Sequence, residues 1–149
     1  MGDTRFATAL QIVITVATNE AAGVRTTSPA IATALNTNAS FVRKIVAALS
    51  KAGVLSSSIG VTGGARLGRP ARSICLLDIH RAVLPEAKLW TVRPDLGSKD
   101  AVSRNIEAIS EELGARADQA VAHILAETTV QDCLDQIAEL ERSRLASSM

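Results

Sequence analysis

The sequence has very few aromatic residues. Phenylalanine, tryptophan and tyrosine together make up 2% of its 149 residues, and tyrosine is absent. Proteins that bind single-stranded nucleic acids stack bases on aromatic side chains, so the composition argues against that class. Hydrophobic residues still make up 47% of the chain. The core must therefore consist of alanine, valine, isoleucine and leucine, which favours thin, closely packed helices.

Two further absences concern the compartment. No stretch of about 18 uncharged apolar residues occurs, so we expect no membrane span. The N-terminus lacks the basic start and the small-residue cleavage site of a signal peptide. The two cysteines, Cys75 and Cys133, are far apart and form no pair motif, which fits a reducing compartment. We therefore expect a cytoplasmic protein.

The sequence also lacks the side-chain sets that enzymes use. It has no paired carboxylates, no nucleophile with an adjacent base and no cluster of metal ligands. The glycines at 60, 63 and 64 are not followed by Gly-Lys-Ser/Thr and do not have Rossmann spacing. His80 and His123 are lone helical histidines, for which structural roles are expected. We predict no catalytic residue, no metal and no cofactor.

Charge divides the chain into two halves. Residues 1–81 contain nine basic and three acidic side chains, a formal net charge of +6, and the remaining residues contain seven basic and twelve acidic ones, −5. A basic half suits a polyanionic partner, which the acidic half would repel.

The basic half has the element order of a winged helix-turn-helix. We predict helices over 4–21, 28–35 and 39–51, strands over 54–58 and 65–67, and a short helix over 76–83. Ser28 is expected to cap its helix, with Pro29 at the first helical position. Segment 4–21 is apolar almost all round, so we expect a partner subunit to cover part of it.

The sequence of the second half predicts mainly helices. Residues 84–97 contain Pro85, Pro94 and the only tryptophan, Trp90, and are interpreted as a linker or ordered loop. A long helix is predicted over 98–127, and a last helix after Thr129 and Asp132, which resemble a capping box. The predicted organisation is a DNA-binding domain over 1–83, a linker over 84–97 and a dimerisation region over 98–149.

The glycine-rich segment and the helix after it carry a family pattern. The chain resembles the Rrf-two family of bacterial, dimeric winged helix-turn-helix transcription regulators. The matching positions are Gly60, Gly63, Gly64, Arg66, Leu67, Arg69, Pro70, Ile74, Leu76, Asp78 and Ile79. Upstream, Ile31-Ala32, the 40–44 segment and the 49–55 segment are similar as well. The resemblance implies a mainly α-helical fold with a small β wing and a long C-terminal dimerisation helix.

Two departures from the family pattern are informative. Ala65 replaces the usual wing aromatic. Cluster-binding members carry three cysteines in the loop before the long helix, whereas residues 84–97 contain none. Iron–sulfur clusters normally need four protein ligands, mostly thiolates, so the sequence resembles the cluster-free branch.

The residues expected to contact DNA lie on the second helix of the motif and on the wing. A recognition helix reads base edges, and wing arginines reach phosphates or a neighbouring groove. Ordinary structural roles remain open for each: Asn38 as a cap, Phe41 as edge of the core, Arg43 as a solvated charge. The set is Ser28, Asn38, Ser40, Phe41, Arg43, Lys44, Thr62, Gly63, Gly64, Arg66 and Arg69.

These observations predict a homodimeric regulator, most simply a repressor, that binds a pseudo-palindromic operator in double-stranded DNA. A small-molecule effector would bind between the two parts of the chain, near Trp90. Two alternatives stay open. One is a thiol sensor of the same fold that uses Cys75 or Cys133, and the other is a winged-helix protein-interaction module that does not bind DNA.

Overall fold

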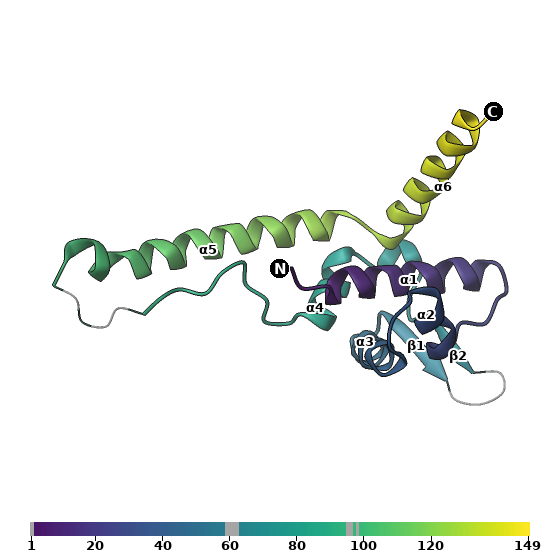
Figure 1. Cartoon of the computed structure of the whole chain (residues 1–149), viewed down its shortest axis with the longest axis horizontal. Helices are drawn as coiled ribbons and strands as arrows, with labels where there is room; N and C mark the ends of the chain where they lie inside the picture. Colours follow the sequence, from purple (N-terminus) through teal and green to yellow (C-terminus); the bar gives the residue numbers. More distant parts are fainter. Residues whose placement is uncertain (1, 59–62, 95–96, 98) are drawn as a thin grey trace.

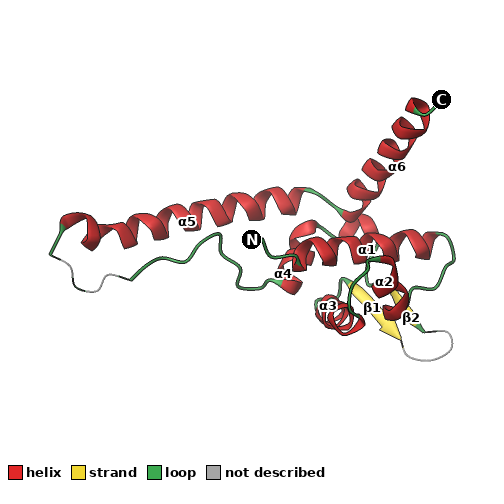
Figure 2. Cartoon of the chain, in the orientation of Figure 1, coloured by secondary structure: helices red, strands yellow, loops and turns green. Residues whose placement is uncertain are grey.

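The structure is a computed structural model that describes residues 2–58, 63–94, 97 and 99–149. It is mostly helical, with one two-stranded sheet, and the predicted fold class is confirmed. Figures 1 and 2 show a winged-helix body from which two helices extend. In chain order the elements are α1 (Arg5–Ala21), α2 (Ser28–Ala34), α3 (Ala39–Lys51), β1 (Leu55–Ser58), β2 (Gly64–Leu67), the 3-10 turn η1 (Ala71–Ser73), α4 (Leu76–Val83), α5 (Ala101–Glu127) and α6 (Val130–Ser147).

Helix α1 lies at the centre of the body and is covered by its own chain. It contacts α3, α4, α6 and β2. Five of its residues are buried, namely Ala9, Ile12, Val13, Val16 and Ala17, while Phe6 and Leu10 are half-buried. The expectation that a partner must cover α1 is therefore not needed, because its apolar faces pack within the subunit.

Helices α2 and α3 form the helix-turn-helix. The α2 cap is Thr27, whose side chain accepts a hydrogen bond from the Ala30 amide at 3.3 Å. The prediction that Ser28 is the cap was wrong: Ser28 is the first helical residue. Between the helices, Asn36 has φ 49°, a left-handed conformation that asparagine tolerates better than most residues. The α3 bounds match the prediction.

The wing is an antiparallel hairpin held against the loop between α1 and α2. Leu55 pairs with Leu67, and Ser58 pairs with Gly64. The Ala65 amide donates to the Thr26 carbonyl at 2.8 Å, and the Leu67 amide donates to Glu20 Oε2 at 2.9 Å. These bonds fix the base of the wing relative to the helix-turn-helix. Its tip, residues 59–62, lies outside the described residues.

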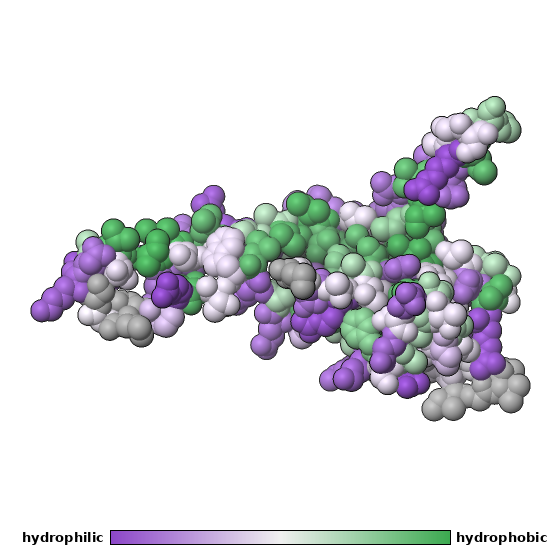
Figure 3. Space-filling view, in the orientation of Figure 1, coloured by the Kyte–Doolittle hydropathy of each residue, from purple (hydrophilic) through white to green (hydrophobic). Residues whose placement is uncertain are grey.

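Helix α5 is long and carries little buried surface. It begins at Ala101, three residues later than predicted, because Asp100 caps it by accepting from the Ser103 amide at 2.9 Å. No residue of α5, all of which the structure describes, is fully buried. Gly114 does not interrupt it. Figure 3 shows hydrophobic residues gathered along one face of this helix.

The start of α6 is tied to the winged-helix body. Thr129 and Asp132 form the predicted capping box. Thr129 also pairs with Cys75 in an isolated β-bridge, in which the Leu76 amide donates to the Thr128 carbonyl at 2.9 Å. Val130 is buried in the core and Leu134 packs against it, whereas the C-terminal part of α6 extends away from the body (Figure 1). Among the described residues, no helix is long and apolar enough to cross a membrane.

Candidate nucleic-acid interface

Helix α3 presents a polar stripe opposite its buried face. Val42, Ile45, Val46 and Leu49 point into the core. Ser40, Arg43, Lys44 and Ala47 follow the same helical spacing on the other side and are exposed. Arg43 Nη2 donates to Ser40 Oγ at 3.4 Å, which orients the guanidinium along the first turn. This stripe of one hydroxyl and two cations suits the edges of base pairs and phosphates.

Three other predicted contact residues also have structural roles. Asn38 caps α3, because its Oδ1 accepts from the amides of Ser40 at 2.7 Å and Phe41 at 3.1 Å. Phe41 is half-buried and packs against the core. Ser28 is half-buried at the start of α2. The fold therefore accounts for these residues without DNA, and contact with DNA remains a prediction for each.

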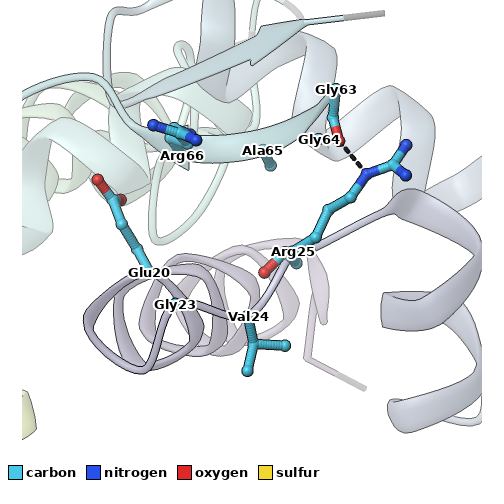
Figure 4. Close-up of a pocket in the computed structure, with 9 residues that line it drawn as sticks. Glu20, Gly23, Val24, Arg25, Gly63, Gly64, Ala65 and Arg66 are labelled. Carbon is cyan, nitrogen blue, oxygen red and sulfur yellow. Dashed lines mark hydrogen bonds between the residues drawn. The ribbon is translucent and has the colours of Figure 1, made fainter. Parts of the chain in front are cut away.

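The wing glycines pack against the protein. Gly64 has φ 146°, and a Cβ there would lie 2.7 Å from the Thr26 carbonyl oxygen. Gly63 is buried, and its carbonyl accepts from Arg25 Nε (Figure 4). The close contact at Gly64 gives a reason for glycine that does not involve DNA, whereas any residue at position 63 could offer its backbone carbonyl to Arg25. Thr62, also predicted to contact DNA, lies outside the described residues.

The two wing arginines differ in their surroundings. Arg66 lies opposite Ser56 in the hairpin and is exposed. Arg69 Nη2 forms an ion pair with Asp78 Oδ2 at 3.2 Å, and the same carboxylate oxygen accepts from the Cys75 amide at 3.1 Å. Arg69 therefore helps to orient the start of α4. Arg66 is the better placed of the two for an external polyanion.

A concavity of about 470 Å³ lies between α2, α3 and the wing. Sequence reasoning placed Ser28, Arg43 and Gly64 on this surface but missed other residues in its wall: Arg25, Thr26, Thr27, Ser57 and Ser58. The arginine before two threonines and the serine run at 56–58 were the available signals. These signals could not be assigned to the concavity from sequence, because the wing brings them together only when it packs against the α1–α2 loop.

A smaller cavity of about 200 Å³ lies behind that loop, between the end of α1 and β2. Figure 4 shows Glu20 and Arg25 rising from the α1 side toward β2, with Arg25 reaching Gly63. Glu20, in the last turn of α1, accepts from the Leu67 amide at the other end of the strand. The end of α1 and the loop that follows it therefore together hold β2 at both ends.

Neither histidine nor cysteine forms a reactive cluster in the described part of the chain. His80 packs edge-on against Phe6 with ring centroids 5.3 Å apart, and exposed His123 pairs with Glu127. Burial, together with the nearby Asp132 carboxylate, raises the pKa of the Cys133 thiol. Partial desolvation and a neighbouring negative charge both disfavour the thiolate of Cys133.

The loop after α4 packs along α5. The Leu89 amide donates to Asp118 Oδ1 at 3.1 Å, and Trp90 Nε1 donates to the Ser110 carbonyl at 3.2 Å. A Cβ at Gly114 would lie 3.3 Å from Trp90 Nε1, so the glycine admits the indole. A cavity of about 440 Å³ adjoins the indole, and its wall includes Glu107, Glu111 and Asp118.

Comparison with known proteins agrees with this geometry. Residues 3–136 match the model of a family named Rrf2 and described as an iron-dependent transcriptional regulator. The chain belongs to the Rrf2 family. YwnA of Bacillus subtilis (strain 168), which is named as an HTH-type transcriptional regulator, is 30% identical over 137 residues, 92% of this chain and 99% of that protein.

Solved structures place this Rrf2 family member among winged-helix proteins. One crystal structure, titled as that of a DNA-binding protein, has a TM-score of 0.69 and 29% identity, and the match covers 87% of this chain and 98% of that one. The global cysteine regulator CymR of B. subtilis has a TM-score of 0.64 and 24% identity over 91% and 97% of the two chains, and it supports the fold alone.

The family description mentions iron, but the residues of this Rrf2 chain do not fit an iron centre. In the described ranges, no three histidine, cysteine, aspartate or glutamate side chains are grouped so that they could hold a metal ion. The sequence offers two cysteines, fewer than a cluster normally needs. No step of the function derived below involves iron.

Proposed function

We propose that this Rrf2 family chain is a DNA-binding repressor that acts as a homodimer on a pseudo-palindromic operator. The observation that carries the proposal is the exposed α3 stripe of Ser40, Arg43 and Lys44. Arg43 lines one concavity together with the wing residues Ser57, Ser58 and Gly64. A recognition helix and a charged wing on one surface can contact adjacent stretches of a duplex. A dimer on an operator that overlaps a promoter would exclude the polymerase.

The apolar stripe of α5 supports the dimer. Val102, Ile106, Ile109, Leu113 and Ile124 are all exposed, and at 100° per residue they fall within a narrow sector of the helix. Stable soluble proteins rarely leave such a continuous apolar face in water. A second copy of α5 offers a matching face. We therefore place dimerisation in the region 98–149 and DNA binding in 1–83.

An effector, if this regulator uses one, would bind in the cavity beside Trp90. That cavity joins the loop 84–94 to α5, and the loop follows directly from α4 of the winged-helix body. A molecule bound there would contact the loop that connects the DNA-binding part to the dimerisation part, and could change how the two parts are spaced. The raised pKa of Cys133 argues against that residue as the sensing thiol of the alternative.

The decisive experiment measures DNA binding at increasing salt. Purified protein is titrated onto the duplex from upstream of its own gene, and we expect an affinity that falls steeply with salt, as phosphate contacts require. Replacing Arg43, Lys44, Arg66 and Arg69 together with glutamine should abolish binding. The control replaces Arg93, Lys99, Arg104 and Arg142, which removes the same charge away from the proposed DNA interface and from the apolar stripe of α5.

Equal loss in both variants would show that only net charge matters. No salt-dependent binding by the unmodified protein would favour the protein-interaction module. For the repressor role, adding protein to in vitro transcription from the same duplex should lower transcript yield. A rise in transcript would make the protein an activator.

A further inference from the structure

We propose that the concavity between α2, α3 and the wing seats the sugar-phosphate backbone of one DNA strand, and that Arg25 contacts a phosphate there. This inference rests on the proposed DNA binding and extends it to a residue that no sequence motif indicated. Arg25 belongs to neither the recognition helix nor the wing; it lies in the loop between α1 and α2.

The walls of the concavity have the chemistry of a phosphodiester site. Two arginines, Arg25 and Arg43, line it together with the hydroxyl residues Thr26, Thr27, Ser28, Ser57 and Ser58, and its described wall contains no carboxylate. Arginine and hydroxyl donors are the common partners of phosphate oxygens. The cavity beside Trp90 has three carboxylates in its wall and would repel the same ligand.

The two arginines that line the concavity come from different elements. Arg43 belongs to α3, and Arg25 belongs to the α1–α2 loop, where its Nε donates to the Gly63 carbonyl (Figure 4). Arg25 also lines the smaller cavity behind the loop, which contains the carboxylate of Glu20, and the Oε2 of Glu20 accepts from the Leu67 amide. Arg25 is thus oriented by the protein before any ligand arrives.

The place of the concavity matches the path of a strand. When α3 enters a major groove and the wing reaches a neighbouring groove, the backbone that separates the two grooves must pass between them. The concavity occupies that position. The bond from the Ala65 amide to the Thr26 carbonyl holds the wing against the loop that carries Arg25.

The test compares Arg25→Gln with Arg25→Lys. Glutamine retains an N–H donor for Gly63 but removes the charge, whereas lysine keeps the charge. The dependence of log affinity on log salt is measured with the upstream duplex and with a random duplex of equal length. Each phosphate contact contributes about 0.9 to the slope, so Arg25→Gln should reduce it by about 0.9 for each bound subunit on both duplexes.

The lysine variant should keep nearly the slope of the unmodified protein. Arg104→Gln, on the side of α5 opposite the apolar stripe, is the matched control and should leave the slope unchanged. An unchanged slope in Arg25→Gln, whatever happens to affinity, would overturn the inference, because a residue that merely positions the wing does not release counterions. If the unmodified protein itself shows no salt-dependent binding, the proposed function fails instead. Circular dichroism melting confirms that each variant is folded.

Discussion

The winged-helix body and the α5–α6 extension use the same kinds of apolar residue in opposite ways. Among the described residues, every fully buried hydrophobic except Val130 lies between Ala9 and Val83. By contrast, the exposed isoleucines and leucines of the helices lie in α5 and α6. The body buries its apolar side chains within one chain, whereas the apolar side chains of the extension are exposed on its surface.

Charge follows the same division. Residues 1–81 carry the net positive charge and the remainder carries the net negative charge. The proposed duplex would be attracted to the first region and repelled by the second. The comparison shows that the body folds around its own core, whereas the apolar face of the extension is where we propose the dimer contact.

The largest expected effect separates the two kinds of apolar residue. Leu49 in α3 is fully buried, and Leu49→Ala should lower the free energy of unfolding by about 2–5 kcal/mol. Leu113 in α5 is 52% exposed, and Leu113→Ala should change the unfolding free energy of the monomer by about 0.5 kcal/mol or less. Urea unfolding at one low protein concentration measures both. Equal losses would show that α5 packs within its own subunit.

The second prediction breaks the dimer without breaking the body. Ile109→Asp places a charge in the centre of the apolar α5 stripe, and burying it should cost about 2 kcal/mol or more of association free energy. Sedimentation should show monomers, with DNA affinity falling about 30-fold or more. Ala108→Asp adds the same charge about 100° away on the helix and should leave the dimer intact. If Ile109→Asp remains dimeric, the interface lies elsewhere.

The third prediction separates the cap role of Asn38 from its place near DNA. Asn38→Ala removes the acceptor for the Ser40 and Phe41 amides and should cost about 1 kcal/mol of unfolding free energy. Asn38→Asp keeps the cap and should retain that stability, but its negative charge should weaken DNA binding. Thermal melts and DNA titrations distinguish the two effects. Unchanged DNA affinity in Asn38→Asp would place Asn38 away from the phosphates.

The sequence was most informative where structure is decided locally. The bounds of α3 follow from an asparagine cap, a buried face at helical spacing and a terminating Ala52-Gly53. The hairpin and α4 follow from equally local signals. Local signals did not fix the helix start where two nearby residues can both act as the N-cap. Thr27 and Ser28 are both able to cap α2, and Ser98 and Asp100 are both able to precede α5, so helix ends were displaced.

Features that depend on distant contacts could not be predicted. The cover over α1 comes from α3, α4, α6 and β2 together, and no periodicity within α1 reveals it. Arg25 was not predicted as a contact residue, because its position depends on a hydrogen bond to Gly63, 38 residues later in the chain. Val130 was assigned to the dimerisation region by sequence, yet its side chain completes the core of the body.

The smallest expected effect concerns the thiol at the junction of the two regions. Burial and the Asp132 carboxylate raise the pKa of Cys133, so more of it stays protonated at neutral pH than of a free thiol. In a Cys75→Ser background, iodoacetamide should therefore alkylate Cys133 more slowly than a free thiol at pH 7, and the midpoint of the rate against pH should lie higher. Asp132→Asn removes the smaller cause and should lower that midpoint only part of the way. A midpoint at or below that of a free thiol would mean that the start of α6 stabilises the thiolate after all, and would reopen the case for a redox signal entering where the extension joins the body.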